Sequence, residues 1–262
     1  MPTKIALQMY TLRDYTKTAQ DFAQTLERVH RIGYAAVQLS AVGAMDGKTP
    51  QVSAKEARKL LDSNGIRCVA THRNWDSLAH NTDFEIEFHH DLGCDFCAIG
   101  GMPTEYNAMG ADGYKRFLDE SAPVIERLNS AGIRFGYHNH AHEFQRYEEH
   151  HKTYYDTFIN SPNPHFLLEI DVYWAAHAGV NPVRLFERLK GRVPLIHAKD
   201  KEVVKEGPVM SPVGEGNMDW DGIIRACKAA KVEWYAVEQD TCRRDPFDCI
   251  RSSYQFLRER GL

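Results

Sequence analysis

Eight short apolar runs of strand type recur through the chain, and segments with helical spacing of their apolar residues separate them. The predicted strands are residues 4–10, 35–40, 66–72, 96–101, 133–140, 166–171, 194–200 and 234–239. The predicted helices are residues 16–32, 53–64, 81–92, 114–131, 153–160, 182–189, 220–231 and 245–260. Eight such units predict an α/β fold, a (β/α)8 TIM barrel. No linker composition divides the 262 residues, so we expect one domain over residues 1–262.

The charge balance narrows the classes of partner. Lys and Arg together number 32 and Asp and Glu number 36, which leaves a net charge of −4 and argues against a nucleic-acid partner. No apolar run approaches the ~20 residues that span a bilayer, and no apolar signal segment follows Met1. We therefore expect a cytoplasmic protein with no membrane partner. The six cysteines are too sparse for a disulfide framework, and Cys94-x-x-Cys97 is interpreted as structural.

The run at residues 133–140, IRFGYHNH, ends in two histidines that share one face of the predicted strand. Desolvating His138 and His140 together is unfavourable unless something binds them. Three later strands also end on polar residues, namely Asp171, His197 and Glu238. Each residue alone has a simpler explanation, since a strand-end Asp often caps the next helix and a lone His is often a core residue.

In a closed barrel these residues are expected to form one site, because the carboxyl ends of all the strands surround one axis. The polar residues at or just past the predicted strand ends are Gln8, Gln38, His72, His138, His140, Asp171, His197, Lys199, Glu238 and Asp240. Imidazoles and carboxylates from successive strands form a mixed nitrogen and oxygen donor set. Such a set suits one divalent ion of Zn, Mn, Co or Fe, and has too much nitrogen for Ca²⁺.

Motifs across the whole chain carry a family resemblance. They are LQMYTLRD, GYAAVQL, THRNWDSL, GYHNHAHEF, LEIDVYWAAHAG, LIHAKD, VGEGNMDWDGII and VEQD. With these motifs the chain resembles the sugar phosphate isomerase/epimerase family of xylose isomerase-like TIM barrels. That family includes inosose dehydratases and is related to endonuclease IV.

The resemblance implies a metal site. The family holds one divalent metal through Glu, Asp, His and Glu on strands five to eight, and Asp171, His197 and Glu238 match the last three. His138 stands where the family has its first Glu. Either His138 takes that ligand's place or His140 does; we expect His138 to bind the metal and His140 to face substrate.

The resemblance also implies a chemistry. Related ketose epimerases use a carboxylate on each face of the sugar, and the metal stabilises an enediolate. Here one of those carboxylates is a histidine, so Glu238 is the expected base, with His72 and His140 as further acid or base groups. We expect a divalent-metal-dependent sugar isomerase or epimerase. The alternative is a dehydratase or lyase acting on a keto-inositol or a 3-keto-sugar.

Further residues are weaker candidates. Lys199 is expected to polarise an oxyanion, although it could be a lysine at the rim of the site. Trp75 and Trp174 are expected to stack on the sugar, although they could only roof the pocket. Gln8 is a candidate substrate contact, and Glu143 either contacts substrate or caps a turn.

Other features receive structural interpretations. Glu169 is interpreted as a structural carboxylate inside the barrel, and the glycines of VGEGNMDW as a weak phosphate signal. The histidine doublets at residues 89–90 and 150–151 are interpreted as surface residues. The expected partner is a small carbohydrate, and a homo-oligomer is possible by analogy. A repair nuclease and a silent sugar-binding barrel are the rival functions.

Overall fold

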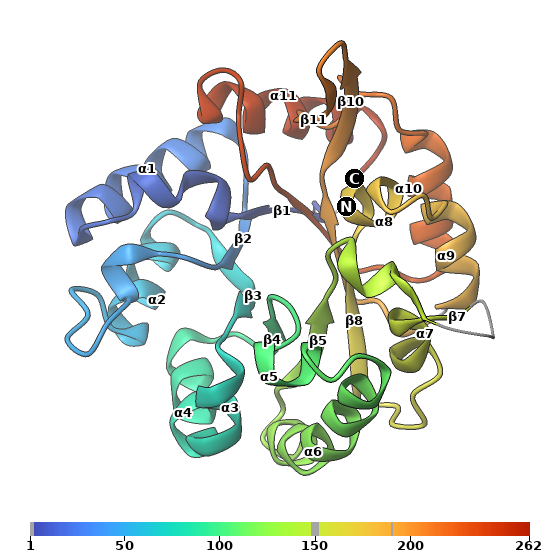
Figure 1. Cartoon of the computed structure of the whole chain (residues 1–262). Coiled ribbons are helices and arrows are strands. Elements are labelled where there is room, and N and C mark those ends of the chain that lie inside the picture. The colour runs from blue at the N-terminus through green and yellow to red at the C-terminus, as the bar shows by residue number, and fades with distance from the viewer. Residues whose placement is uncertain (1–2, 148–151, 190) are drawn as a thin grey trace.

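The computed structural model describes residues 3–147, 152–189 and 191–262, in which eight parallel strands close into a barrel ringed by helices (Figure 1). The barrel strands are β1 (Ile5–Gln8), β2 (Ala36–Leu39), β3 (Arg67–His72), β4 (Phe96–Ile99), β5 (Arg134–His138), β8 (Phe166–Asp171), β9 (Leu195–Ala198) and β12 (Trp234–Val237). They pair in the order β1-β12-β9-β8-β5-β4-β3-β2, with β2 closing on β1. The predicted (β/α)8 barrel is confirmed.

The helices follow the strands as a TIM barrel requires, with some additions. They are α1 (Ala19–Ile32), α2 (Ala54–Ser63), α3 (Trp75–His80), α4 (Thr82–Leu92), α5 (Thr104–Asn107), α6 (Ala111–Ser130), α7 (Tyr154–Ile159), α8 (Val172–His177), α9 (Pro182–Arg188), α10 (Trp220–Ala229) and α11 (Pro246–Glu259). The short helices α3, α5 and α8 are not among the predicted ones, because each spans too few turns to display a helical period.

Two small antiparallel hairpins lie outside the barrel. The strands β10 (Asp200–Val204) and β11 (Gly207–Ser211) pair within a segment that the sequence presents as a loop (Figure 1). The strands β6 (Arg146–Tyr147) and β7 (Lys152–Thr153) form the second hairpin. Within the described residues, no helix combines the length and the apolar character that a membrane crossing needs.

A second apolar cluster of the barrel consists mostly of small side chains. It is formed by Ala6, Ala36, Val69, Ala70, Phe96, Ala98, Leu195 and Ala236. The ring of Phe96 occupies the space beside Gly136, where an added Cβ would lie 2.5 Å from a ring carbon. Gly136 therefore lets one aromatic ring close the interior just below the polar residues of β5.

One predicted surface residue belongs to the packing between barrel and helices. His89 of α4 is fully buried, so its prediction as a surface residue is wrong. Its Nε2 lies 2.7 Å from the Thr71 hydroxyl of β3 and its Nδ1 2.6 Å from the Glu85 carbonyl. These two hydrogen bonds satisfy the ring inside the protein. His90 is exposed as predicted, and residues 150–151 lie outside the described residues.

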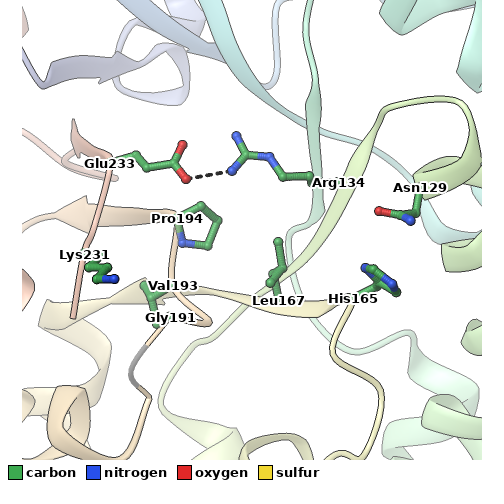
Figure 2. A pocket seen from close by; sticks show the side chains of 9 residues that line it. All are labelled: Asn129, Arg134, His165, Leu167, Gly191, Val193, Pro194, Lys231 and Glu233. Carbon is green, nitrogen blue, oxygen red and sulfur yellow. Dashed lines mark hydrogen bonds and ion pairs between the residues drawn. The ribbon is translucent and has the colours of Figure 1, made fainter.

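The amino ends of β5, β8, β9 and β12 line a cavity of about 370 Å³ (Figure 2). Arg134 and Glu233 meet there at 2.8 Å, near Leu167 and Pro194. Arg134 is also 3.5 Å from Asp95, so its charge is balanced by two carboxylates. In TIM barrel enzymes this end of the barrel contributes stability, and the active site lies at the opposite end.

Candidate functional site

A pocket of about 350 Å³ opens at the carboxyl ends of the strands. It is lined by Tyr10, Ser40, His72, Gly100, His138, His140, Lys199, Glu238 and Asp240. Most of these residues are polar or titratable, in contrast to the alanine-rich interior below them. The carboxyl ends of the strands are also where TIM barrels hold their catalytic residues.

Three of the four predicted metal ligands lie together because their strands are neighbours. Asp171 ends β8 and pairs in register with His197 of β9, and Glu238 follows β12 directly. One donor atom from each of the three lies within 4.8 Å of the others, and all three side chains are buried. Asp171 also caps α8, since its Oδ1 accepts a hydrogen bond from the Trp174 amide at 2.9 Å. The cap uses one carboxylate oxygen and leaves Oδ2 for the site.

Lys199 lies among the carboxylates rather than at the rim. Its Nζ is 2.7 Å from Glu238 Oε2, 2.8 Å from Asp240 Oδ1 and 2.9 Å from Asp171 Oδ2, and the side chain is 1% exposed. Burial lowers the lysine pKa, but Asp171 and Glu238 outweigh burial and raise it above its ordinary value. Burial raises the pKa of Asp171 to about 6, although Lys199 opposes this shift. Lys199 is therefore a fixed positive charge between the site carboxylates.

His197 is held through both ring nitrogens. Nδ1 lies 2.7 Å from Glu238 Oε2, while Nε2 lies 2.8 Å from Glu169 Oε1 and 2.9 Å from the side-chain oxygen of Gln38. Burial lowers its pKa, but Glu238 and Glu169 outweigh burial and raise it to about 10. His197 thus bridges two carboxylates, one at each ring nitrogen.

Glu169, which the sequence predicts to be a structural carboxylate inside the barrel, lies against three imidazoles of the site. It is fully buried on β8, and His72 Nε2 lies 2.5 Å from its Oε1. His138 Nδ1 lies 3.3 Å from the same oxygen, and Gln38 donates to Oε2 at 2.7 Å. Burial raises the pKa of Glu169, but His72 and His197 outweigh it and hold the pKa well below its usual range. Its position two residues before Asp171 on one strand face was the available signal.

The two histidines of the HNH run have different surroundings. His138 lies beside His197, with ring centroids 4.3 Å apart, and burial lowers its pKa well below the ordinary value. His140 lies nearer the rim, where its ring is 5.6 Å from that of Trp174. Burial and the nearby Lys199 lower the pKa of His140 to about 4, so its ring is neutral at neutral pH. Donor atoms of His138, His72, Glu169 and His197 lie within 4.8 Å of one another, so His138 shares His197 with the group of Asp171 and Glu238.

Several buried polar atoms near the pocket have no hydrogen-bond partner among the described residues. They are Nδ1 of His138, Nδ1 of His140, Oδ2 of Asp171, Nε1 of Trp174 and Nε2 of Gln8. The Asp171 oxygen is close enough to Lys199 for an ion pair, but the pair lacks the angle of a hydrogen bond. Unsatisfied buried groups are unfavourable for folding, so their concentration here points to a bound ligand.

Two residues predicted to contact substrate are not among those that line the pocket. Trp75 is 8% exposed, and its ring packs edge-on against Phe117 at 4.8 Å. Glu143 is fully buried and accepts hydrogen bonds from the Tyr137 hydroxyl and the His140 amide, each at 2.8 Å. Trp75 belongs to the core and Glu143 caps a turn, so both are left out of the proposed site. Trp174 remains, with its ring 5.8 Å from Lys199 Nζ.

The donor set fits a divalent cation. Four carboxylates, those of Glu169, Asp171, Glu238 and Asp240, converge on a region that contains one ammonium group, that of Lys199. Protons on the imidazoles or a divalent cation can offset the remaining negative charge. Asp171, His197 and Glu238 supply two carboxylates and one imidazole, which suits the transition metals named above better than Ca²⁺.

Comparison with solved structures shows the same fold in several enzymes. A sugar phosphate isomerase/epimerase from Parabacteroides distasonis is 23% identical, with 100% of this chain and 96% of that chain covered and a TM-score of 0.80. The IOLI protein with a bound zinc atom is 15% identical, with 98% and 97% covered and a TM-score of 0.70. The probable 3-DHS dehydratase AsbF from Bacillus anthracis is 12% identical, with 99% and 100% covered and a TM-score of 0.70.

These identities are low enough that the likeness establishes the fold alone. None of the curated proteins matches the sequence significantly. The family model described as xylose isomerase-like TIM barrel matches residues 26–260, which includes seven of the eight barrel strands and every residue of the predicted metal set. The chain therefore belongs to the xylose isomerase-like TIM barrel family.

Proposed function

We propose that the chain is a divalent-metal-dependent sugar isomerase or epimerase that removes a proton from the carbon beside a carbonyl. The observation that carries this proposal is the convergence of Asp171, His197 and Glu238 within 4.8 Å at the mouth of the barrel, with surplus buried negative charge around them. His138 completes the proposed ligand set. A metal bound there would polarise the substrate carbonyl and stabilise the negative charge that develops on its oxygen.

The remaining steps belong to side chains of the pocket. Glu238 is the proposed base, because its carboxylate faces the pocket and is ionised: burial raises its pKa, but Lys199 and His197 outweigh burial and lower it. Lys199 lies 2.7 Å from Glu238 and stabilises a neighbouring oxyanion. His72 contacts Glu169 through Nε2, and its Nδ1 lies beside Gly100 on the pocket wall. His72 and His140 are proposed as the further acid or base groups.

A dehydratase or lyase acting on a keto-inositol or 3-keto-sugar is the second candidate. It starts with the same proton removal, after which a leaving group departs instead of a proton returning. The presence of His138 and His140, rather than a second carboxylate, at the end of β5 favours this alternative. The structural likeness to AsbF, a probable dehydratase, is consistent with it.

Solvent deuterium incorporation tests both candidates, because both begin with removal of a carbon-bound proton. A panel of ketoses, phosphorylated ketoses and a keto-inositol is incubated with the protein in D2O and followed by NMR. We expect incorporation that disappears on chelation and returns with Zn²⁺, Mn²⁺, Co²⁺ or Fe²⁺. Loss of water from the product, seen by mass spectrometry, identifies a dehydratase. Undiminished exchange by metal-free protein, or no exchange with any substrate, contradicts the proposal.

The proposed partner is a small carbohydrate, in keeping with the isomerases among the structural neighbours. Cytoplasmic localisation, a single domain and a homo-oligomer remain predictions from the sequence. Size-exclusion chromatography with light scattering would measure the oligomeric state directly.

A further inference from the structure

A single oxygen of Glu169 faces three imidazoles. His72 Nε2 is 2.5 Å from Oε1, His197 Nε2 is 2.8 Å away and His138 Nδ1 is 3.3 Å away. The other oxygen accepts a hydrogen bond from Gln38 at 2.7 Å. An ionised carboxylate only accepts hydrogen bonds, so each ring nitrogen that bonds to it must carry the hydrogen. Glu169 therefore selects the tautomer of the rings around it.

This selection determines which nitrogen of His197 can bind a cation. With hydrogen on Nε2, a neutral His197 ring keeps its lone pair on Nδ1. That nitrogen lies 2.7 Å from Glu238 Oε2, on the side of the proposed metal ligands. Ligand histidines in metalloproteins commonly donate their other ring N–H to a carboxylate in this way.

The same reasoning applies to His138. Its Nδ1 has no hydrogen-bond partner among the described residues, and Glu169 Oε1 is the carboxylate oxygen within ion-pair distance of it. With Nδ1 directed at Glu169, the nitrogen left for a cation is Nε2. His138 and Glu169 are also paired in register across β5 and β8, so backbone pairing holds the two side chains next to each other.

Charge distinguishes Glu169 from a carboxylate that only fills space. Glu143 is equally buried, but beside a tyrosine hydroxyl and a backbone amide it has only one imidazole within ion-pair distance, that of His142 at 3.3 Å. The ion pairs that the described residues offer Glu169 come from imidazoles alone, and no lysine or arginine is among them. Those rings therefore link Glu169 to a cation bound at Asp171 and Glu238.

We propose that Glu169 is the positioning residue of the metal site, which directs Nδ1 of His197 and Nε2 of His138 toward one divalent ion. This inference rests on the proposed metal dependence, and it adds a residue and two defined coordinating atoms. Glu169 itself stays outside the coordination sphere. Because Glu169 orients both rings and makes them more basic, the affinity for the metal depends on it.

The test compares Glu169→Gln with Glu143→Gln, a matched change of another fully buried carboxylate at the same end of the barrel. Co²⁺ and Zn²⁺ dissociation constants are measured by competition with a chromophoric chelator, and the visible spectrum of the Co²⁺ protein is recorded. We expect Glu169→Gln to weaken binding about 10- to 100-fold and to shift the Co²⁺ bands. We expect the metal dissociation constants of Glu143→Gln to stay within about twofold of those of wild type. Any small change would be an indirect effect of the turn that Glu143 caps. Circular dichroism of the metal-free proteins checks that both variants fold.

Wild-type affinity and an unchanged Co²⁺ spectrum in folded Glu169→Gln would overturn the inference. If that variant does not fold, a crystal structure of Zn²⁺-loaded wild type decides the question. Coordination through His197 Nδ1 and His138 Nε2 supports the inference, while coordination through His197 Nε2 or by Glu169 Oε1 overturns it. Metal binding as inferred without turnover of any carbohydrate would refute the proposed function alone. Absence of any divalent metal binding would refute both.

Discussion

Two buried polar clusters lie on either side of the barrel wall, and they are built on different principles. The helix-side cluster consists of Thr71, Arg73, Ser77, Glu85 and His89. In it Arg73 donates twice to Glu85, at 2.7 and 2.9 Å, and Ser77 donates at 2.5 Å. Each charge has an opposite charge, and both nitrogens of His89 have partners.

The mouth cluster consists of His72, His138, Glu169, Asp171, His197, Lys199, Glu238 and Asp240. It contains more carboxylates than cations, and it leaves His138 Nδ1 and Asp171 Oδ2 without hydrogen-bond partners among the described residues. A cluster that serves stability alone is expected to be balanced and satisfied, as the helix-side cluster is. The proposed cation and substrate would offset the imbalance at the mouth.

The largest expected effect is on catalysis. Glu238→Gln keeps the size of the side chain but removes the proposed base and alters a proposed metal ligand, so we expect deuterium incorporation to fall about 10²- to 10⁴-fold. Because the change removes one surplus negative charge, metal-free protein should unfold at the wild-type temperature or above it. Glu233→Gln, at the amino end of the barrel (Figure 2), is the control and should keep full activity. Loss of activity in Glu233→Gln with full activity in Glu238→Gln would instead place the active site at the amino end of the barrel.

The next largest effect is on stability and belongs to the helix-side cluster. Arg73→Met leaves Glu85 buried without its positive partner, so we expect the free energy of unfolding to fall by about 3 kcal/mol. Urea denaturation measures this loss. The metal affinity of the remaining folded protein should match that of wild type. A large loss of metal affinity with unchanged stability would mean that the two clusters are not separate.

Metal removal should lower the free energy of unfolding only where the mouth cluster is intact. Bound metal at 100 times its dissociation constant stabilises wild type by about 2.7 kcal/mol, and chelation should remove that increment from the free energy of unfolding. Asp171→Asn lacks a proposed ligand, so chelation should leave its stability unchanged. Arg73→Met should respond to chelation as wild type does. An equal response in wild type and Asp171→Asn would exclude Asp171 as a ligand.

The smallest effect concerns pH and His89. Burial lowers the pKa of His89 below 6.5, partly offset by its bond to the Glu85 carbonyl, so the unfolded chain binds a proton first as pH falls. Stability from this residue is complete above pH 6.5 and declines below it, by at most about 1.4 kcal/mol per pH unit. Wild type should therefore lose more stability than His89→Gln between pH 7.5 and 5. A constant difference between the two proteins across that range would contradict this account.

The barrel could be predicted from sequence because apolar runs and helical spacing recur eight times, and seven of the eight strands end on polar residues. His138, Asp171, His197 and Glu238 could be named because strand ends in a closed barrel face a common axis. Short helices could not be predicted in the same way. The burial of His89 also escaped prediction, because a lone polar residue on a helix does not reveal the threonine that it meets across the barrel wall.

The role of Glu169 could not be predicted because it depends on register. A strand pattern says that Glu169 faces inward, but only the pairing of β5 with β8 places it opposite His138. The position of Lys199 among the site carboxylates depends in the same way on the pairing of β9 with β12. The sequence also could not show whether Trp75 packs in the core or faces the pocket, because an aromatic residue in a loop after a strand can do either.

Anomalous diffraction from crystals of the Mn²⁺-loaded protein is the most direct test that the mouth cluster holds a cation. The account predicts one strong peak, at about 2.0 to 2.2 Å from donor atoms of Asp171, His197 and Glu238. Well-ordered crystals that show no peak at the mouth, or show one only beside Arg134 and Glu233 at the other end, would contradict it.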